Sequence, residues 1–169
     1  MDWLTAVAQW LHVFFGIFWF GGTLYATFVV LPAMSRLPPM NARAMSLQLS
    51  VQIARVIPFV ALATIVLGFV RGTALGPISG VADLTSPYGI WWLVGFVVAT
   101  ALFLWGWYVI TPAVERMNGD EEAWAESTDR PSARLAALIA RVRLVATIEL
   151  VGFAVILVSM VAMHAVSEG

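Results

Sequence analysis

Two histidines are the side chains in this sequence best suited to bind a redox metal. The chain has 2 His and no Cys, which excludes thiolate metal sites and cysteine nucleophiles. His12 and His164 lie in different apolar segments, and two imidazoles from two helices can hold heme b inside a helix bundle. A tetrahedral zinc site needs more ligands than this pair supplies. The two histidines therefore predict a bis-histidine heme b site.

Small and polar residues recur around His12 at the spacing of one helix face. On an otherwise apolar helix, such a face is expected to point toward protein rather than lipid. Gly16, one turn from His12, leaves space for a bulky group beside the imidazole. The face fits two interpretations, a heme or metal ligand at His12 or a packing surface with a hydrogen-bonded histidine. Its members are Thr5, Gln9, His12, Gly16, Thr23 and Thr27.

The surroundings of His164 allow more than one role. His164 is either the second heme ligand or an interfacial histidine that contacts lipid headgroups. Met160 and Met163 flank it and offer thioether ligands, although methionine on a lipid-facing helix also serves for packing alone. Arg71, at the end of another apolar segment, is expected to pair with a heme propionate or another carboxylate. The alternative for Arg71 is a side chain that extends from the helix end to water.

Glu149 is the only acidic residue well inside an apolar segment. Ionisable groups in a membrane are costly and usually face the interior of a helix bundle. We expect Glu149 to pair with Arg55 or with another arginine near the same membrane face. The alternative is that Glu149 belongs to a proton path.

The composition indicates what kind of chain positions these residues. Of its 169 residues, 61% are hydrophobic and only 11% are charged, and the mean hydropathy is +0.90. Soluble domains carry about 25% charged residues, and disordered chains are polar, so both classes are excluded. The 9 basic residues are all arginine and are balanced by 10 acidic residues. We therefore expect neither nucleic-acid binding nor lysine Schiff-base chemistry.

Four apolar segments are long enough to cross a membrane as helices, which need about 20 residues each. Backbone groups within lipid must bond internally, and none of these segments alternates like a barrel strand. We predict an all-α integral membrane four-helix bundle that forms one domain over residues 1–169. The polar connection at residues 118–132 is expected to be a solvated loop. The predicted helices cover residues 3–31, 51–70, 88–112 and 132–166.

Arginine placement predicts the orientation of the bundle. Eight of the nine arginines lie near the connections that follow the first and third helices, and only Arg71 lies on the other side. By the positive-inside rule, the arginine-rich side is cytoplasmic. Both termini are then expected outside the inner membrane of a bacterium.

The first and third segments end in similar sequences. Pro32 and Pro112 are each followed by Ala and, four residues after the proline, by Arg36 and Arg116. This pattern suggests two pseudo-repeated helical hairpins of the same orientation, as in transporters with parallel repeats. The alternative is that proline and arginine recur where any helix leaves the membrane.

The stretch from Trp10 to Met34 resembles the first helix of a group of small membrane heme proteins. The group comprises the copper-resistance D-like (CopD) proteins, the membrane-type protoporphyrinogen oxidases and the membrane domain of bacterial urate oxidases. The passage from Trp91 to Arg116, with a histidine closing the last helix, is most similar to the urate oxidase domain. The first two families typically carry a lysine in the third helix, which this chain lacks. The shared motifs are Leu11-His12, Trp19-Phe20-Gly21, Pro32 and Ser86-Pro87-Tyr88-Gly89.

The resemblance implies heme b and a membrane redox function, and three functions stay open. The first is electron transfer, as a heme b protein or as a redox subunit of a larger membrane complex, with other subunits or quinone as partners. The second is a heme-dependent oxidoreductase of the protoporphyrinogen oxidase type. The third is a cofactor-free structural subunit or a transporter of copper or another small solute. The bilayer is the expected surrounding in each case, and a homo-oligomer is an alternative to a monomer.

Overall fold

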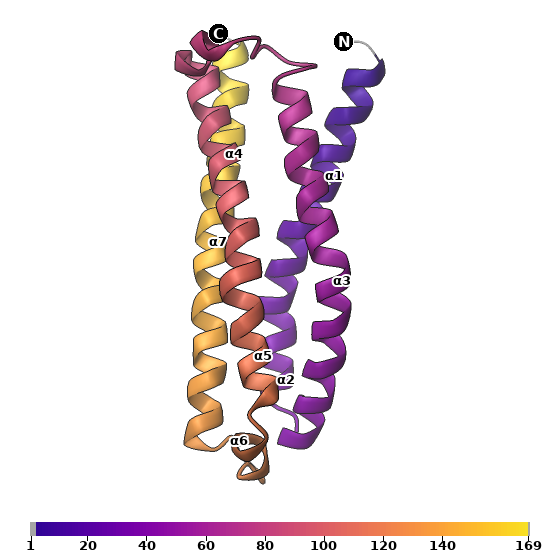
Figure 1. Cartoon of the computed structure of the whole chain (residues 1–169), viewed down its shortest axis with the longest axis vertical. Coiled ribbons are helices and arrows are strands. Elements are labelled where there is room, and N and C mark those ends of the chain that lie inside the picture. The colour runs from indigo at the N-terminus through magenta and orange to yellow at the C-terminus, as the bar shows by residue number, and fades with distance from the viewer. Residues whose placement is uncertain (1–2, 169) are drawn as a thin grey trace.

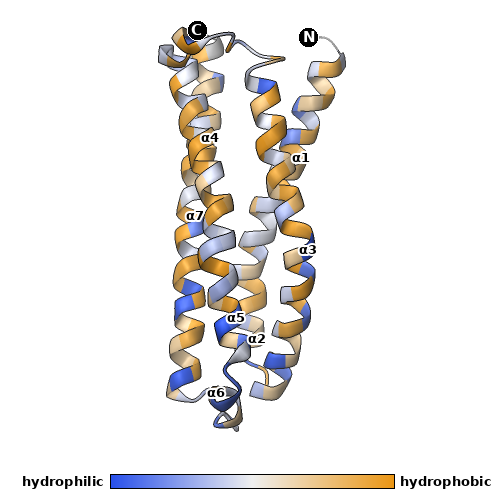
Figure 2. Ribbon diagram, viewed as in Figure 1, coloured by the Kyte–Doolittle hydropathy of each residue, from blue (hydrophilic) through white to orange (hydrophobic). Residues whose placement is uncertain are grey.

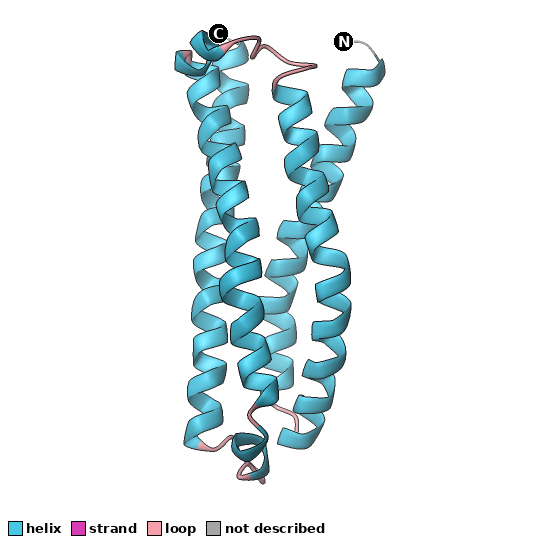
Figure 3. Cartoon of the chain, in the orientation of Figure 1, coloured by secondary structure: helices cyan, strands magenta, loops and turns pink. Residues whose placement is uncertain are grey.

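The computed structural model describes residues 3–168 of the chain. These residues form helices joined by loops, with no strand among them (Figure 3). The helices form four rods, one for each candidate membrane span. Figure 1 shows the rods side by side, with the start of α1 (Trp3–Tyr25) and the end of α7 (Ala133–Glu168) at the same end of the bundle. Each rod contains an apolar stretch long enough to cross a membrane. The predicted all-α four-helix bundle is confirmed, and it is the architecture of an integral membrane protein.

The four rods are assembled from eight helical segments. The first rod joins α1 (Trp3–Tyr25), η1 (Ala26–Val30) and α2 (Leu31–Met34), and the second is α3 (Pro39–Gly72). The third rod joins α4 (Pro87–Trp105), η3 (Gly106–Ile110) and α5 (Thr111–Gly119), and the fourth is α7 (Ala133–Glu168). Two further short helices, η2 (Val81–Thr85) and α6 (Glu121–Ala125), lie in the connections.

The second helix begins earlier than hydropathy alone predicts, at Pro39 rather than at residue 51. Proline is tolerated in the first helical turn because its missing N–H has no helical partner there. Ala42 and Ser46 are buried, so this part of α3 presents an inward face despite its mixed composition. The Ser46 hydroxyl donates to Asn118 Oδ1 at 2.7 Å, which joins α3 to α5.

Both η1 and η3 are π-helical, and each directly precedes a helix that starts with a proline, Pro32 or Pro112. Proline lacks an N–H and crowds the preceding turn, and here the helix widens instead of breaking. In each rod, the N–H just before the proline donates to a carbonyl five residues earlier. The two rods therefore carry the same distortion at the same distance from the repeated prolines.

The bundle consists of two antiparallel hairpins. The first rod packs mainly along α3, and α4 packs mainly along α7 (Figure 1). Trp19 and Phe153 join the two hairpins by an edge-to-face contact with ring centroids 5.0 Å apart. We call the end with the chain termini the terminal end. Polar residues gather at the other end, the arginine-rich end (Figure 2), which includes Arg43, Arg116, Arg130 and Arg134.

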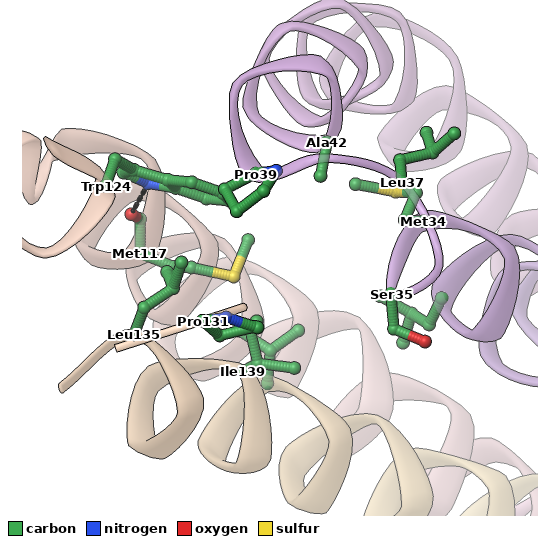
Figure 4. A pocket seen from close by; sticks show the side chains of 12 residues that line it. Met34, Ser35, Leu37, Pro39, Ala42, Met117, Trp124, Pro131, Leu135 and Ile139 are labelled. Carbon is green, nitrogen blue, oxygen red and sulfur yellow. Dashed lines mark hydrogen bonds between the residues drawn. The ribbon is translucent and has the colours of Figure 1, made fainter. Parts of the chain in front are cut away.

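The polarity of residues 118–132 predicts a solvated loop, but the structure shows that this connection is partly folded and buried. It contains α6, in which Ala123 and Trp124 are buried. The Trp124 Nε1–H donates to the Met117 carbonyl at 2.7 Å, a bond drawn in Figure 4. Trp124 and Pro39 border a small cavity of about 40 Å³ there (Figure 4). The connection thus forms a packed cap over the arginine-rich end, because two apolar residues lie among its charged ones.

Asp83 organises the connection at the terminal end. The Ser79 hydroxyl and the backbone N–H groups of Ser79 and Gly80 donate to Asp83 Oδ2 at 2.8 to 2.9 Å. These hydrogen bonds hold the pKa of Asp83 below its usual value, and the bond from the Ser79 hydroxyl has the largest effect. A Cβ on Gly89 would collide with the Asp83 carbonyl, so α4 can start in this position only with glycine there.

Candidate cofactor site

A cavity of about 230 Å³ lies between the two hairpins, toward the terminal end. All four rods line it, and its wall is almost entirely apolar. An apolar cavity with few, placed polar groups is the usual form of a ligand or cofactor site. The lining residues that bear on its chemistry are His12, Gly16, Thr64, Gly68, Trp92, Phe96, Met160 and Met163.

His12 is held by a hydrogen bond to the neighbouring helix. Its Nδ1 lies 2.8 Å from the Thr64 carbonyl of α3, which can only accept, so Nδ1 carries the proton. The neutral ring then has its lone pair on Nε2. Metal-binding histidines commonly donate one N–H to a carbonyl in this way, which fixes the ring and its tautomer. His12 therefore combines a free lone pair with a place in the cavity wall.

Gly68 makes room for the imidazole. A Cβ at this position would lie 2.7 Å from His12 Cε1 and 3.1 Å from His12 Nδ1. Gly16, predicted to clear this space, lines the cavity, but a Cβ there would contact only Thr64 at 3.7 Å. The close approach to the ring thus comes from α3 rather than from the helix that carries His12.

An aromatic wall borders the cavity on the side of α4. Trp92 and Phe96 stack with ring centroids 5.4 Å apart and an angle of 4° between their planes. Phe69 packs against both rings at 6.0 and 5.6 Å. Trp92 Nε1 also lies 3.4 Å from the Gly68 carbonyl, which ties this wall to the helix turn behind His12. A flat conjugated ligand would find matching surfaces here.

Two methionines, and not His164, face the cavity from α7. Met160 and Met163 line it, whereas His164 is exposed and is not part of its wall. The reason is helical geometry, because successive residues of a helix are rotated by about 100°. Residues 160 and 163 are three apart and share a face, whereas residue 164 is rotated away from that face. Only one of the two predicted histidine ligands, His12, therefore belongs to this cavity.

Arg71 lies one turn beyond Gly68 on α3, toward the terminal end, outside the cavity wall. Its Nη1 donates to the Leu75 carbonyl at 3.2 Å. Its Nε is buried, and no residue within 3–168 forms a hydrogen bond with it. A buried donor without a partner is costly, so this nitrogen is suited to meet a carboxylate such as a heme propionate.

Glu149 lies on α7 away from the cavity, and the ion pair predicted for it is not formed. Its side chain is buried, with 7% of its surface exposed, and within residues 3–168 it makes no hydrogen bond or ion pair. Arg55, the expected partner, is exposed. Of the other arginines near that membrane face, Arg43 is half-buried and pairs with Glu121 at 3.3 Å, and the rest are exposed.

Across the described part of the chain, no group of three or more His, Cys, Asp and Glu side chains could hold a metal ion. A heme needs only two axial donors, so the cavity residues fit a heme better than a bare hard cation. Comparison with protein-family models, curated proteins and solved structures gives no match. The function of the cavity is therefore inferred from the residues that line it.

Proposed function

We propose that this protein binds heme b in the cavity between its hairpins and transfers electrons in the membrane. The observation that carries the proposal is the hydrogen bond from His12 Nδ1 to the Thr64 carbonyl, which leaves Nε2 as a ligand at the cavity. A bound heme supplies one-electron redox chemistry. The chain supplies an axial nitrogen, an apolar surrounding and aromatic contacts.

The second axial ligand in this proposal is a methionine of α7. Met160 and Met163 both line the cavity together with His12. A thioether opposite an imidazole is an established heme ligand set, and it raises the reduction potential compared with two imidazoles. We therefore replace the bis-histidine site expected from sequence by His12 with Met160 or Met163, and assign His164 no bond to iron.

Arg71 completes the proposed site at the terminal end. Its unpartnered Nε would donate to a propionate, and a charge-assisted bond of this kind is about twice as strong as a neutral one. The proposal agrees with the resemblance to the CopD, protoporphyrinogen oxidase and urate oxidase group. It places the arginine-rich end in the cytoplasm of a bacterium and the heme toward the outer leaflet. Quinone or another membrane redox subunit is the proposed electron partner.

The test is the absorbance spectrum of the protein purified from heme-replete membranes. The proposal predicts a Soret band and about one heme per chain by pyridine hemochrome assay. Reduction should sharpen the visible bands, as expected for a six-coordinate iron. A protein that folds and carries no heme after reconstitution would contradict the proposal and favour a cofactor-free subunit or transporter.

A copper site is the second candidate, because three soft or borderline donors share one cavity. His12, Met160 and Met163 would hold Cu(I), which prefers thioether and imidazole ligands. The two candidates give opposite results in one preparation. A copper site predicts about one copper per chain by elemental analysis, no Soret band, and loss of copper in Met160→Leu.

A further inference from the structure

Glu149 is a buried carboxyl in the apolar part of the bundle that the proposed heme site does not use. It is 7% exposed and makes no hydrogen bond or ion pair with any described residue. An isolated carboxylate in such surroundings is strongly disfavoured, and the group avoids this cost by holding a proton. Unpaired acidic side chains inside membrane helices are accordingly often parts of proton paths.

Aromatic rings separate Glu149 from the cavity. Phe153, one turn from Glu149 toward the terminal end, contacts Trp19 and Phe20 with ring centroids 5.0 and 5.1 Å apart. Both Trp19 and Phe153 are buried and line the cavity, so they form its floor. Gly152 fits tightly against Leu102 of α4 at the same level, since a Cβ there would lie 2.6 Å from Leu102. The contacts that these side chains make between the cavity and the carboxyl are apolar.

On the arginine-rich side of Glu149, α7 contacts the two π-helical segments η1 and η3. The carbonyl of Val145, one turn toward the arginine-rich end, accepts from Trp105 Nε1 at 3.1 Å. Trp105 directly precedes η3, and α7 also contacts η1. Because Pro32 and Pro112 have no N–H, a carbonyl in the turn before each lacks its helical donor. Val109 and Ile110 of η3 pack against an apolar cluster that includes Val142 and Val145 of α7, so the carbonyl oxygens freed by the prolines are the groups there to which water can bond.

No charged group faces Glu149 from the helices packed against it, as far as the structure describes them. On the first rod, His12 lies beyond the aromatic floor and Tyr25 is 61% exposed. On the third rod, Tyr108 is 70% exposed. On α3, Arg55 is exposed. The nearest charged residues along α5 and α7 are also exposed: Glu115, Arg116, Arg141 and Arg143.

We propose that Glu149 is a proton-binding site that exchanges with water at the arginine-rich end through the two proline-distorted turns. The aromatic floor closes it from the terminal end. On uptake, an O–H bond forms at the carboxyl with a proton taken from water at the arginine-rich end, and release reverses that step. No electron moves, so the site is independent of any cofactor in the cavity.

The test uses a hydrophobic carbodiimide, which reacts with protonated carboxyls in apolar surroundings. The carboxyl O–H adds across one C=N bond, and the adduct rearranges to a stable N-acylurea without losing atoms. In the full chain in lipid vesicles, peptide mass spectrometry should find this adduct at Glu149. The adduct should be absent from Glu149→Gln and unchanged in the control Glu115→Gln, whose carboxyl is exposed.

Sidedness is measured by changing the pH on one face of the vesicles at a time. Vesicle orientation is read from the exposed marker Thr128→Cys with an impermeant thiol reagent. Raising the pH at the arginine-rich end should slow labelling of Glu149 several-fold, and raising it at the terminal end should not. Phe153→Ala, or Phe153→Leu if the first variant folds poorly, should make labelling respond from both ends.

Three outcomes would overturn the proposal. The first is that folded protein forms no adduct at Glu149. The second is that the rate of Glu149 labelling does not change with the pH on either side. The third is that the rate of Glu149 labelling in the wild type changes with the pH at the terminal end. Each measurement is made with and without heme in the cavity. A failure of the heme proposal therefore leaves the result on Glu149 unaffected, and the reverse also holds.

Discussion

The imidazole of His12 and the backbone carbonyl of Thr64, 52 residues apart in the sequence, are joined by a hydrogen bond of 2.8 Å between α1 and α3. This bond fixes which ring nitrogen carries the proton and so which one is available to a ligand. It can form only because Gly68, one turn further along α3, leaves space for the ring.

Substituting Gly68 should displace the imidazole. In Gly68→Ala the new Cβ would lie 2.7 Å from His12 Cε1, so the ring must move and lose its bond to Thr64. We expect a loss of about 1–3 kcal/mol in unfolding free energy, the usual cost of overpacking. Denaturation in detergent measures this loss.

The matched control is Gly21→Ala on α1, where a Cβ would meet nothing within 4 Å. Alanine is favoured over glycine inside a helix by about 0.5–1 kcal/mol, so this variant should be neutral or slightly more stable. Equal stability of the two variants would show that the space beside His12 is not filled as described.

The packed cap at the arginine-rich end should depend on Trp124. Trp124→Phe removes the bond from Nε1–H to the Met117 carbonyl and leaves that carbonyl unsatisfied. We expect a loss of about 1–3 kcal/mol in unfolding free energy. The control Trp107→Phe changes a side chain that is 56% exposed and should stay within about 0.5 kcal/mol of wild type. If both variants match wild type, α6 does not stabilise the bundle.

Acid should loosen the connection that Asp83 organises. Because the pKa of Asp83 is lower in the folded chain, its carboxylate stabilises the connection fully above the pKa of the unfolded chain, about 3.9. This stabilisation is lost as the pH falls through the lower pKa of the folded chain. Pepsin cleavage within residues 73–86 should therefore increase as the pH drops from about 5 to about 2. In Asp83→Asn, cleavage should be fast throughout this range. A wild-type rate that does not rise would contradict this account.

The orientation of the bundle can be tested without interference from native thiols, because the chain has no Cys. Thr85→Cys marks an exposed position at the terminal end, and Thr128→Cys marks one at the arginine-rich end. By the positive-inside rule, an impermeant thiol reagent added to whole cells should label the first and spare the second. Labelling of Thr128→Cys alone would reverse the proposed topology.

Hydropathy predicted the four spans because a membrane requires long apolar helices, but it missed the start of α3 and the helix α6. At Pro39 and at Trp124, the apolar contacts lie on one face of a polar segment, and the average over residues hides them. The pairing of His12 with Thr64 and Gly68 could not be predicted from one sequence, since it depends on the register of two helices. Met160 and Met163 did carry a signal, because their spacing of three places both on one face.

The spectra of His12→Ala and His164→Ala in the reduced state decide whether His12 binds the heme iron. Only His12 lies in the cavity wall, with its Nδ1 bonded to Thr64. We predict that His12→Ala loses the heme or becomes high-spin, and that His164→Ala keeps the wild-type spectrum. An unchanged spectrum in His12→Ala, or its loss in His164→Ala alone, would contradict the assignment of His12 as the axial ligand.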